Sequence, residues 1–525
     1  MKLNLENALG TILDDDFRGD NPIPDALRFS YTLVKKDKFF GYIESLLRDQ
    51  NYKAKPLLAI DVPKSNFTIR PMGRPEIQDW IIYQAIIDFL IPKIINKLSA
   101  RSYSKLRFQN PERKTQPWIK FDAESRNYYN SGFKHVVVTD ISSYFENIDL
   151  EELRRKILNY NQRSSEYKEV VDFLLIQFLK PWSSGRVRGF GLPQGPTASS
   201  FLGDVYLDSI DKEMEEERGY LRYMDDIRIF CKKEINAKKA LIKLVKALRR
   251  YRLNINAKKT RILAGEEVSK YLFDPKKPLL DAIQSAFDSR NRERINAIVP
   301  ILVNDVLLGG FLEENQFNQR HINFAIFRLS ILKTSGVAFN ESRVVRIILD
   351  NFIKQPQNTN TFCSFLALFP GNNIIERNFL KFLQSENNIY EWQELHILRA
   401  LLEMKIKLTS PQIGWFWKRL NDKNLHWSLR SMYSLLVGKC GSARDRDKLI
   451  DLFDNTENNE FLRSLTLSVQ ELGVAARNDF YNDIRSQVLP PMFVNYVKSL
   501  ERPTYFMAHE RVTIKRFEEA KEKYY

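Results

Sequence analysis

Cysteine is scarce in this sequence. The 525 residues include three cysteines, Cys231, Cys363 and Cys440, and no two of them are spaced as zinc ligands are. We therefore expect reduced thiols in a cytoplasmic protein without structural zinc. The amino terminus lacks the apolar core of a secretion signal, and no uninterrupted run of about 18 apolar residues occurs. These absences predict a soluble protein that has no membrane partner.

Negative charge is also in the minority. Asp and Glu number 65 against 81 Lys and Arg, a formal net charge of +16. Twelve basic residues and a single acid, Glu234, lie between residues 232 and 261. A block this basic predicts contact with a polyanion such as nucleic acid. Because residues 241–248 repeat leucine and valine at helical spacing, the solvated face of an amphipathic helix is the alternative.

A second basic segment is interleaved with aromatic residues. This mixture suits phosphate contact combined with base stacking, which contributes roughly 1–3 kcal/mol per stacked base. The members of this segment are Arg101, Tyr103, Lys105, Arg107, Phe108, Arg113, Lys114, Trp118 and Lys120.

Two adjacent carboxylates, Asp225 and Asp226, interrupt an apolar alternation over residues 221–230. The alternation predicts two strands with one buried face each, joined by a turn that carries both acids. A solvated Asp-Asp turn is the alternative, since like charges repel and such pairs are common in turns. Three further segments favour a functional role.

These three segments surround the hairpin in sequence. In residues 134–145, a Val run predicts a fully buried strand with Asp140 at its C-terminal end. Residues 189–200 form a Gly/Pro loop and then the start of a helix with small side chains, which let another backbone or a base pair come close. Residues 253–260 are a short strand followed by a lysine pair.

In this order and spacing the four segments resemble motifs A, B, C and D of the reverse transcriptase palm. The resemblance implies a right-hand polymerase with α+β fingers and palm over residues 1–275, and it implies deoxynucleoside triphosphates as substrates. Transfer of a phosphoryl group needs in-line geometry and neutralised charge, which two cations about 3.5–4 Å apart supply.

The resemblance also implies roles for individual residues. Asp140, Asp225 and Asp226 would be the catalytic carboxylates, and together with Ile141 they would bind two Mg²⁺ ions, with Mn²⁺ as the alternative metal. Phe145 would exclude a ribose 2′-hydroxyl, and Lys259 would approach the triphosphate as a general acid or as a charge. The expected nucleotide-binding positions are Arg70, Arg74, Phe145, Gln194, Gly195 and Lys259.

The fingers are expected upstream of these motifs. Residues 67–70 predict a strand, residues 71–75 a turn and residues 79–90 a largely buried helix, a succession that resembles the fingers of group II intron and retron-like reverse transcriptases. One departure from the family pattern is Asp204, which stands where many relatives carry Asn.

After about residue 275 the resemblance fades and helical periodicity takes over. Tetrapeptides that begin Leu-Arg recur at Leu398, Leu429 and Leu462, with a looser copy at Phe327. A period of just over 30 residues predicts an α-solenoid, with coincidence among Leu-rich helices as the alternative. We expect residues 276–525 to form an all-α, HEAT-like helical-repeat domain in place of a polymerase thumb.

A palm joined directly to helical repeats resembles the abortive-infection reverse transcriptases of bacterial antiphage defence. That resemblance implies a homo-oligomer and DNA synthesis that can be template-independent and primed on a tyrosine hydroxyl, so that single-stranded DNA is covalently attached. Tyr524 and Tyr525 are candidate primers among 22 tyrosines. Two alternatives stay open: a reverse transcriptase that copies a dedicated non-coding RNA, and an inactive nucleic-acid-binding scaffold.

Overall fold

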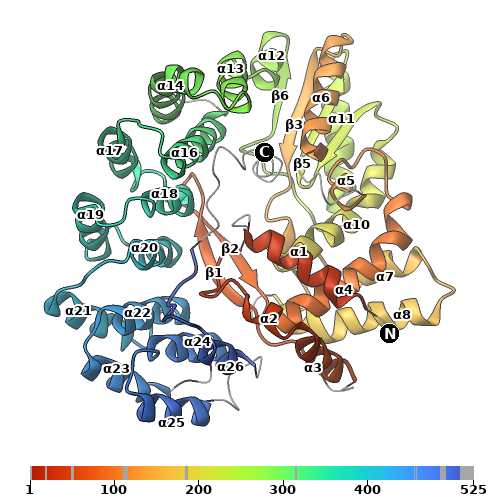
Figure 1. Cartoon of the computed structure of the whole chain (residues 1–525). Coiled ribbons are helices and arrows are strands. Elements are labelled where there is room, and N and C mark those ends of the chain that lie inside the picture. The colour runs from red at the N-terminus through yellow and green to blue at the C-terminus, as the bar shows by residue number, and fades with distance from the viewer. Residues whose placement is uncertain are drawn as a thin grey trace.

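A four-stranded antiparallel sheet lies at the centre of the first half of the chain (Figure 1). The computed structural model describes residues 3–17, 21–48, 52–109, 116–183, 187–313, 316–453, 456, 458–484 and 492–508, so Tyr524 and Tyr525 lie outside the described residues. The strand order is β4 (Gly219–Tyr223), β5 (Asp226–Cys231), β3 (His135–Asp140) and β6 (Arg261–Ala264).

Helices surround this sheet and extend from it, and we call the part of the chain that precedes β3 the fingers, after the predicted domain. Those that precede β3 are α1 (Leu5–Phe17), α2 (Tyr31–Val34), α3 (Lys36–Arg48), α4 (Ile77–Ile94), α5 (Leu106–Gln109) and α6 (Gln116–Asn130). Those that follow it are α7 (Leu150–Asn159), α8 (Ser165–Phe173), α9 (Lys180–Ser183), α10 (Thr197–Met214), α11 (Glu234–Arg249) and α12 (Glu266–Leu272).

Both faces of the sheet are covered. Val137 and Ile229 belong to the main apolar core, to which α10 and α11 contribute, whereas the neighbouring Val136 and Phe230 pack into a second apolar cluster with α6 and α12. Successive side chains of a strand point to opposite faces, so a strand covered on both sides has to be apolar throughout. The expectation of a buried strand before Asp140 is confirmed.

The fingers contain a separate two-stranded hairpin of β1 (Leu58–Pro63) and β2 (Ile69–Arg74). The predicted turn over residues 71–75 is wrong, because β2 continues to Arg74 and the chain turns at residues 64–68, where Phe67 has φ +63°. Pro71 is tolerated within β2 because this strand pairs on one side only, so its missing N–H leaves no gap in the pairing. The predicted buried helix is confirmed as α4, where residues 77–87 are all buried.

The second half of the chain is helical throughout its described residues, as its periodicity predicted. An inner row of helices packs side by side, and an outer row flanks it (Figure 1). The inner row consists of α16 (Asn318–Thr334), α18 (Thr359–Leu366), α20 (Glu391–Glu403), α22 (Trp427–Cys440) and α24 (Asn459–Ser468). The outer row consists of α17 (Glu341–Asn351), α19 (Asn373–Leu383), α21 (Ser410–Leu420), α23 (Ala443–Ile450) and α25 (Val474–Ile484).

Further helices stand at the two ends of these rows. Three precede them, α13 (Lys277–Asp288), α14 (Arg292–Ile301) and α15 (Gly309–Leu312), and α26 (Phe493–Lys498) follows them. We call the helices α13 to α26 the helical array. Figure 1 shows the array curving away from α12 and returning to the fingers, where α20 contacts β1 and α26 contacts α2.

The recurring tetrapeptides occupy the inner row, on α16, α20, α22 and α24. Two of their arginines reach back to preceding helices: Arg399 donates to Ser364 Oγ on α18 at 2.9 Å, and Arg430 donates to the Leu420 carbonyl of α21 at 3.0 Å. Arg463, by contrast, pairs with Glu460 on its own helix, α24.

One helical segment within the array is long and apolar enough to cross a membrane by length and composition alone. It spans Arg292–Leu312, and 44% of its most apolar window is buried within the protein. The core helix of a soluble protein meets the same criterion, so a single segment of this kind is weak evidence for a membrane span. Sequence inspection missed this segment because Pro300 and Asp305 interrupt its apolar residues.

Candidate active site

Three carboxylates meet where the central strands end. Asp140 is the last residue of β3 and pairs in register with Asp226, the first residue of β5, while Asp225 lies in the turn between β4 and β5. The Ile141 backbone N–H donates to the Asp225 carbonyl at 3.2 Å, which fixes the turn against β3. Met224 takes the left-handed φ of +55° that so tight a turn requires. The three acids named from the sequence therefore come together.

The three acids differ in exposure: Asp140 is buried, Asp225 is half-buried and Asp226 is exposed. Burial and the charge of Asp140 raise the pKa of Asp225, and the cationic Arg70 and Lys259 oppose this rise. Loss of hydration beside the packed strands and the charge of Asp225 raise the pKa of Asp226 to about 6. This crowding of negative charge is costly unless cations compensate it.

Lys259 supplies part of that compensation, because its Nζ lies 2.5 Å from Asp140 Oδ2. The other oxygen of the same carboxylate, Oδ1, is buried and accepts no hydrogen bond from the described residues. An orphaned, buried carboxylate oxygen beside a second carboxylate suits a hard cation such as Mg²⁺.

The donor set fits Mg²⁺ only in part. Among the residues that the structure describes, no three acidic, His or Cys side chains converge closely enough to form a complete metal site. Magnesium ordinarily takes one or two protein carboxylates and fills its other positions with water and substrate phosphates. Asp140 and Asp225 match that incomplete set, and the backbone carbonyl of Ile141 stays a predicted ligand.

Arg70 and Lys259, two of the residues expected to bind the nucleotide, carry charges that act on these acids. The placement of Phe145, Gln194 and Gly195 around the acids stays a prediction, and Arg74 is an exception. Arg70 is exposed on β2, and its charge acts on Asp225. Phe145 is half-buried beside α10, with its ring 3.7 Å from where a Cβ on Gly203 would lie. The Gln194 carbonyl accepts from the Gly73 N–H at 2.9 Å, which joins the loop before α10 to the β1–β2 hairpin.

Gly195 follows in the same loop with φ +131°, a conformation that side chains other than glycine rarely adopt. A Cβ at this position would lie 3.3 Å from the Gly73 carbonyl oxygen. Both the backbone conformation and the close approach of the hairpin therefore favour glycine here.

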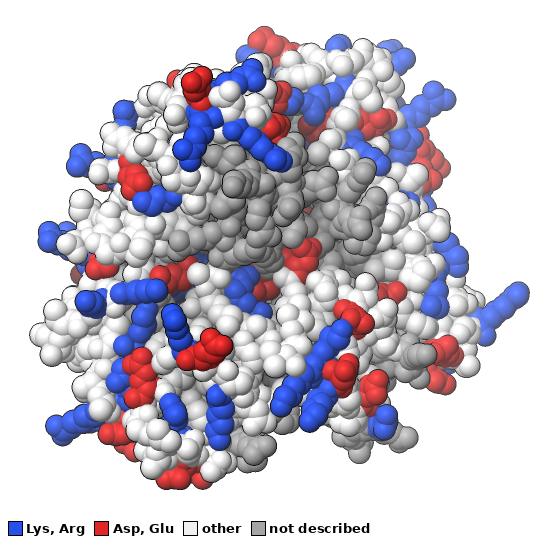
Figure 2. All heavy atoms as spheres, in the orientation of Figure 1, with Lys and Arg blue, Asp and Glu red and all other residues white. Residues whose placement is uncertain are grey.

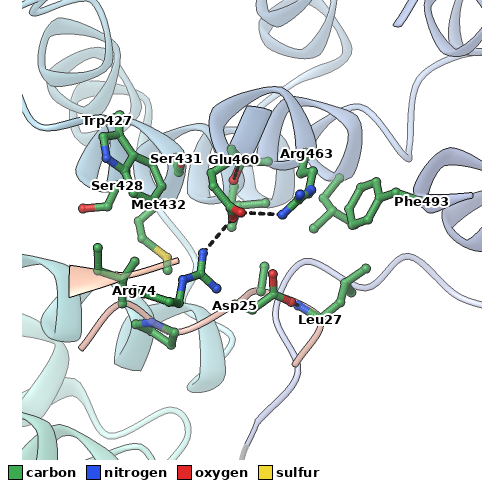
Figure 3. Close-up of a pocket in the computed structure, with 16 residues that line it drawn as sticks. Asp25, Leu27, Arg74, Trp427, Ser428, Ser431, Met432, Glu460, Arg463 and Phe493 are labelled. Atoms are coloured by element: carbon green, nitrogen blue, oxygen red, sulfur yellow. Dashed lines mark hydrogen bonds and ion pairs between the residues drawn. The ribbon is translucent and has the colours of Figure 1, made fainter. Parts of the chain in front are cut away.

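The exception is Arg74, which faces away from the carboxylates. It is 2% exposed, and its Nη2 lies 2.9 Å from Glu460 on α24 (Figure 3). The guanidinium also lies over the ring of Phe29, 5.3 Å from its centroid. The expectation that Arg74 binds the triphosphate is wrong for this structure, because its charge is neutralised by the helical array.

Comparison with known proteins agrees with this arrangement. Residues 62–276 match the family model described as "Reverse transcriptase (RNA-dependent DNA polymerase)". The chain contains a reverse transcriptase domain. The match begins near the end of β1 and ends one residue before α13, so it covers β2, the sheet and all three carboxylates and stops at the helical array.

Similarity to individual proteins is low. Over 184 residues the chain is 24% identical to Protein YkfC of Escherichia coli (strain K12), which is 33% of this chain and 45% of that protein. The chain thus spans less than half the length of this curated relative.

Solved structures of telomerase are more distant. Apo telomerase from Candida tropicalis is 12% identical, with a TM-score of 0.31, over 69% of this chain and 73% of that one. Telomerase from Candida albicans, with a TWJ fragment of telomeric RNA, is also 12% identical, with a TM-score of 0.31, over 74% and 68% of the two chains.

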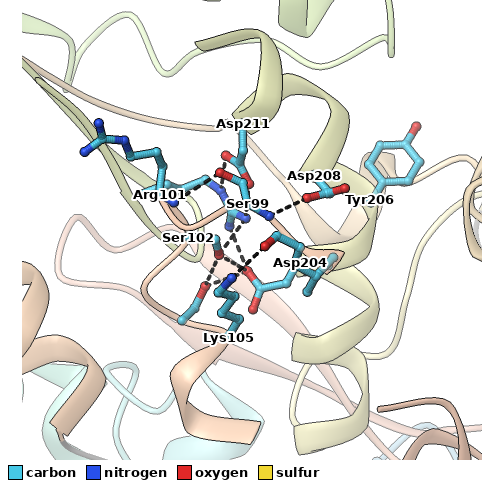
Figure 4. Close-up of polar contacts among 12 residues, drawn as sticks. Ser99, Arg101, Ser102, Lys105, Asp204, Tyr206, Asp208 and Asp211 are labelled. Carbon is cyan, nitrogen blue, oxygen red and sulfur yellow. Dashed lines mark hydrogen bonds and ion pairs between the residues drawn. The ribbon is translucent and has the colours of Figure 1, made fainter. Parts of the chain in front are cut away.

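A buried polar network supports the turn between β4 and β5, which we call the catalytic turn after its predicted role. Arg222, just before the turn, is 1% exposed and donates to Asp204 at 2.9 Å, to Asp211 at 2.6 Å and to the Met224 carbonyl at 2.8 Å. Ser102 donates to the same oxygen of Asp204 at 3.1 Å. Figure 4 shows Asp204, Asp208 and Asp211 along α10, facing the segment from Ser99 to Lys105.

This network explains the Asp at position 204, because its carboxylate is one of two that neutralise Arg222. Sequence inspection named the departure at Asp204 but missed Arg222. The sequence signal that could have identified Arg222 was its charge within an otherwise apolar strand, β4, four of whose five residues are buried. A charge in such a strand has to find a partner inside the protein.

The basic block lies mainly behind the sheet. Helix α11 buries Ala237, Ala240 and Leu244 on the face opposite α6, and it leaves Lys238 and Lys246 exposed. Lys259, near the end of the block, reaches the carboxylates. Contact between α11 and nucleic acid stays a prediction. Because α11 lies behind the sheet, a polyanion bound to it would not lie across the catalytic turn. Elsewhere, on the face shown in Figure 2, basic side chains are interspersed with acidic ones over the helical array.

The segment that mixes basic and aromatic residues is partly packed into the domain, although Trp118 is exposed. The Tyr103 ring packs on Phe121 with centroids 5.9 Å apart, and Phe108 packs on Phe201 at 5.3 Å. Lys105 is buried and donates to the Leu98 carbonyl at 2.6 Å. The rings of Tyr103 and Phe108 are both half-buried, and base stacking by this segment stays a prediction. Arg113 and Lys114 lie outside the described residues.

Proposed function

We propose that this protein is a DNA polymerase of the reverse transcriptase type that acts in antiphage defence in the cytoplasm. The observation that carries the polymerase activity is the meeting of Asp140 and Asp225 at the strand ends, with Arg70 and Lys259 beside them. A site that gathers acids and cations in this way suits a triphosphate bound together with divalent metal. Residues outside a functional site seldom keep so costly a cluster of like charges.

Each residue then has a defined task in nucleotidyl transfer. Asp140, Asp225 and the Ile141 carbonyl would hold Mg²⁺, and the bound metal supplies charge neutralisation of the triphosphate and activation of the attacking hydroxyl. Arg70 orients the triphosphate through its guanidinium, and Lys259 exchanges its contact with Asp140 for one with a phosphate oxygen. Phe145, part-exposed beside α10, bounds the space next to the sugar and favours deoxyribose.

The proposed role in defence rests on the helical array that follows the reverse transcriptase domain. We assign residues 276–525 to a HEAT-like repeat domain in place of a thumb, within a homo-oligomer, as in the abortive-infection reverse transcriptases that this chain resembles. On that resemblance, synthesis needs no template and begins on a tyrosine hydroxyl, so the single-stranded product is covalently attached to the protein.

A second candidate is templated synthesis on a bound non-coding RNA. The exposed basic face of α11, remote from the catalytic turn, favours it, because an RNA held there would leave the site accessible. A catalytically inactive nucleic-acid-binding scaffold fits less well, since all three carboxylates are retained at an energetic cost.

The test uses purified full-length protein and Asp225→Asn, assayed with deoxynucleoside triphosphates and Mg²⁺. We expect the unaltered protein to incorporate deoxynucleotides without added template. The DNA product should be nuclease-sensitive and should stay attached to the protein in denaturing gels. The mass of the protein in solution should exceed that of one chain. Incorporation that requires one co-purifying RNA would instead support the templated candidate.

Asp225→Asn should abolish incorporation, and cells that express it should lose protection against phage in a plaque assay. Incorporation by Asp225→Asn equal to that of the unaltered protein would refute the polymerase assignment. Full incorporation without any effect on plaque number would refute the defence role alone.

A further inference from the structure

The β1–β2 hairpin carries Arg70 and depends on contacts with other elements to fix its position. It is a two-stranded sheet separate from the central sheet, and such a hairpin is marginally stable by itself. On its palm side, the Gly73 N–H donates to the Gln194 carbonyl at 2.9 Å. That bond lies at one end of β2, so the position of the rest of the hairpin depends on its other neighbours.

Those neighbours belong to the helical array, which holds the hairpin at its turn and at its base. At the turn, the Tyr390 hydroxyl donates to the Phe67 carbonyl at 2.8 Å. At the base, His426 Nε2 lies 2.8 Å from the Ala59 carbonyl. Nδ1 of His426 accepts from the Ser428 N–H at 3.3 Å, so in this tautomer Nε2 is the donor.

A buried ion cluster adds a stronger contact at the base. Arg74, the last residue of β2, pairs with Glu460 at 2.9 Å, and Glu460 also pairs with Arg463 on the same helix (Figure 3). Asp25, from the segment before α2, is the second acid of this cluster, and burial raises its pKa. A cavity of about 30 Å³ remains among these side chains, room for about one water molecule.

These contacts bracket Arg70. The Tyr390 contact lies three residues before it and the Glu460 contact four residues after it, which is about 10 Å and about 13 Å along an extended chain. A strand fixed on both sides of one residue has little freedom to move that residue away from the site. The charge of Arg70 reaches Asp225 in this arrangement.

We infer that Tyr390, His426 and Glu460 of the helical array are positioning residues that hold Arg70 where the triphosphate of an incoming nucleotide binds. The array thus serves the nucleotide site through the fingers, without touching the substrate. This inference rests on the proposed function, because it takes Arg70 as a ligand of the triphosphate.

The experiment measures kcat and the apparent KM for dTTP with the full-length protein, under the templated or template-free condition that the unaltered protein supports. Tyr390→Phe removes one hydrogen bond at a half-buried position, and we expect it to raise KM about fivefold with kcat nearly unchanged. Tyr496→Phe is the matched control. Its hydroxyl also joins the array to the fingers, by donating to Ser30 Oγ at 3.1 Å, but it does not touch the hairpin, so KM should not change.

A double-mutant cycle with Arg70→Ala separates positioning from a general effect on the fold. Arg70→Ala should raise KM, and Tyr390→Phe should then have no further effect, because the residue that it positions is gone. Arg74→Glu and Glu460→Arg should each raise KM. The double variant, which exchanges the charges of the buried pair, should lower KM part of the way back to the unaltered value. Tyr390→Phe keeps the inference testable should the buried variants fail to fold.

The outcomes distinguish this inference from the proposed function. An unchanged KM in Arg70→Ala would refute the triphosphate role of Arg70 and with it this inference, whereas the polymerase assignment would still stand if Asp225→Asn abolishes incorporation. A raised KM in Arg70→Ala with an unchanged KM in Tyr390→Phe would overturn the positioning inference alone. Equal effects of Tyr390→Phe with and without Arg70 would also overturn it, because the array would then act by another route.

Discussion

Replacing Arg222 by methionine should destabilise the reverse transcriptase domain more than any change at its surface. The guanidinium is 1% exposed and neutralises Asp204 and Asp211, which are themselves buried on α10. Methionine has a similar volume but no charge, so both carboxylates would remain inside without a cationic partner. Burial already raises the pKa of Asp211 with Arg222 present, and removal of the arginine would raise it further.

The magnitude follows from the burial of the groups. Removing one member of a buried ion pair costs about 3–5 kcal/mol, because the partner's charge is left uncompensated. The Tyr220 hydroxyl, 2.7 Å from Asp211, and the Ser104 hydroxyl, 2.5 Å from Asp204, would soften this cost but cannot replace a charge. We therefore expect a loss of about 3 kcal/mol or more in the free energy of unfolding.

Urea unfolding followed by circular dichroism measures this loss, with Lys212→Met as the matched control. Lys212 pairs with Asp208 on the same helix at 2.7 Å, but its side chain is 48% exposed, so its removal should cost less than about 1 kcal/mol. Equal unfolding midpoints for the two variants would refute the reasoning. Arg222→Met should also slow DNA synthesis under conditions in which the variant is still folded, since Arg222 donates to the Met224 carbonyl in the catalytic turn.

Three further predictions concern other parts of the chain. Phe145→Ala should lower the preference for deoxy- over ribonucleotides by about tenfold or more, measured as the ratio of kcat/KM for dTTP and UTP, and an unaltered ratio would make Phe145 a packing residue only. Burial raises the pKa of Asp79 to about 7, so the folded state holds this proton more tightly than the unfolded state does. Stability should accordingly fall by up to about 4 kcal/mol as the pH rises from about 4 to above 7, and urea unfolding of Asp79→Asn should lack this dependence. Changing both Lys238 and Lys246 to Glu should weaken binding of single-stranded RNA and make the slope of log K against log salt concentration shallower by about 1.4; an unchanged slope would leave α11 as a solvated surface.

The catalytic turn could be predicted because its signals are local. An apolar alternation broken by Asp225 and Asp226 specifies a hairpin with acids at its turn, and the Val run before Asp140 specifies a buried strand, whatever surrounds them. Helical period likewise predicted the second half, since repeated apolar positions record which side of each helix is buried. The turn of the fingers hairpin was predicted in the wrong place because a proline such as Pro71 is a local signal for a turn. Pro71 is acceptable within β2 only because no strand pairs with β2 on its other side, which the local sequence does not show.

By itself, then, the sequence determined the hairpin that carries Asp225 and Asp226, the buried strand before Asp140 and the helical character of the second half. Only the tertiary structure decided the partners of the charged side chains. Arg70 and Arg74 lie on one strand and look equivalent in sequence, yet one is exposed toward the carboxylates and the other is buried against Glu460, far along the chain. The physical reason is that a buried charge takes whichever counter-charge folding brings within about 4 Å, and no local pattern records that distance.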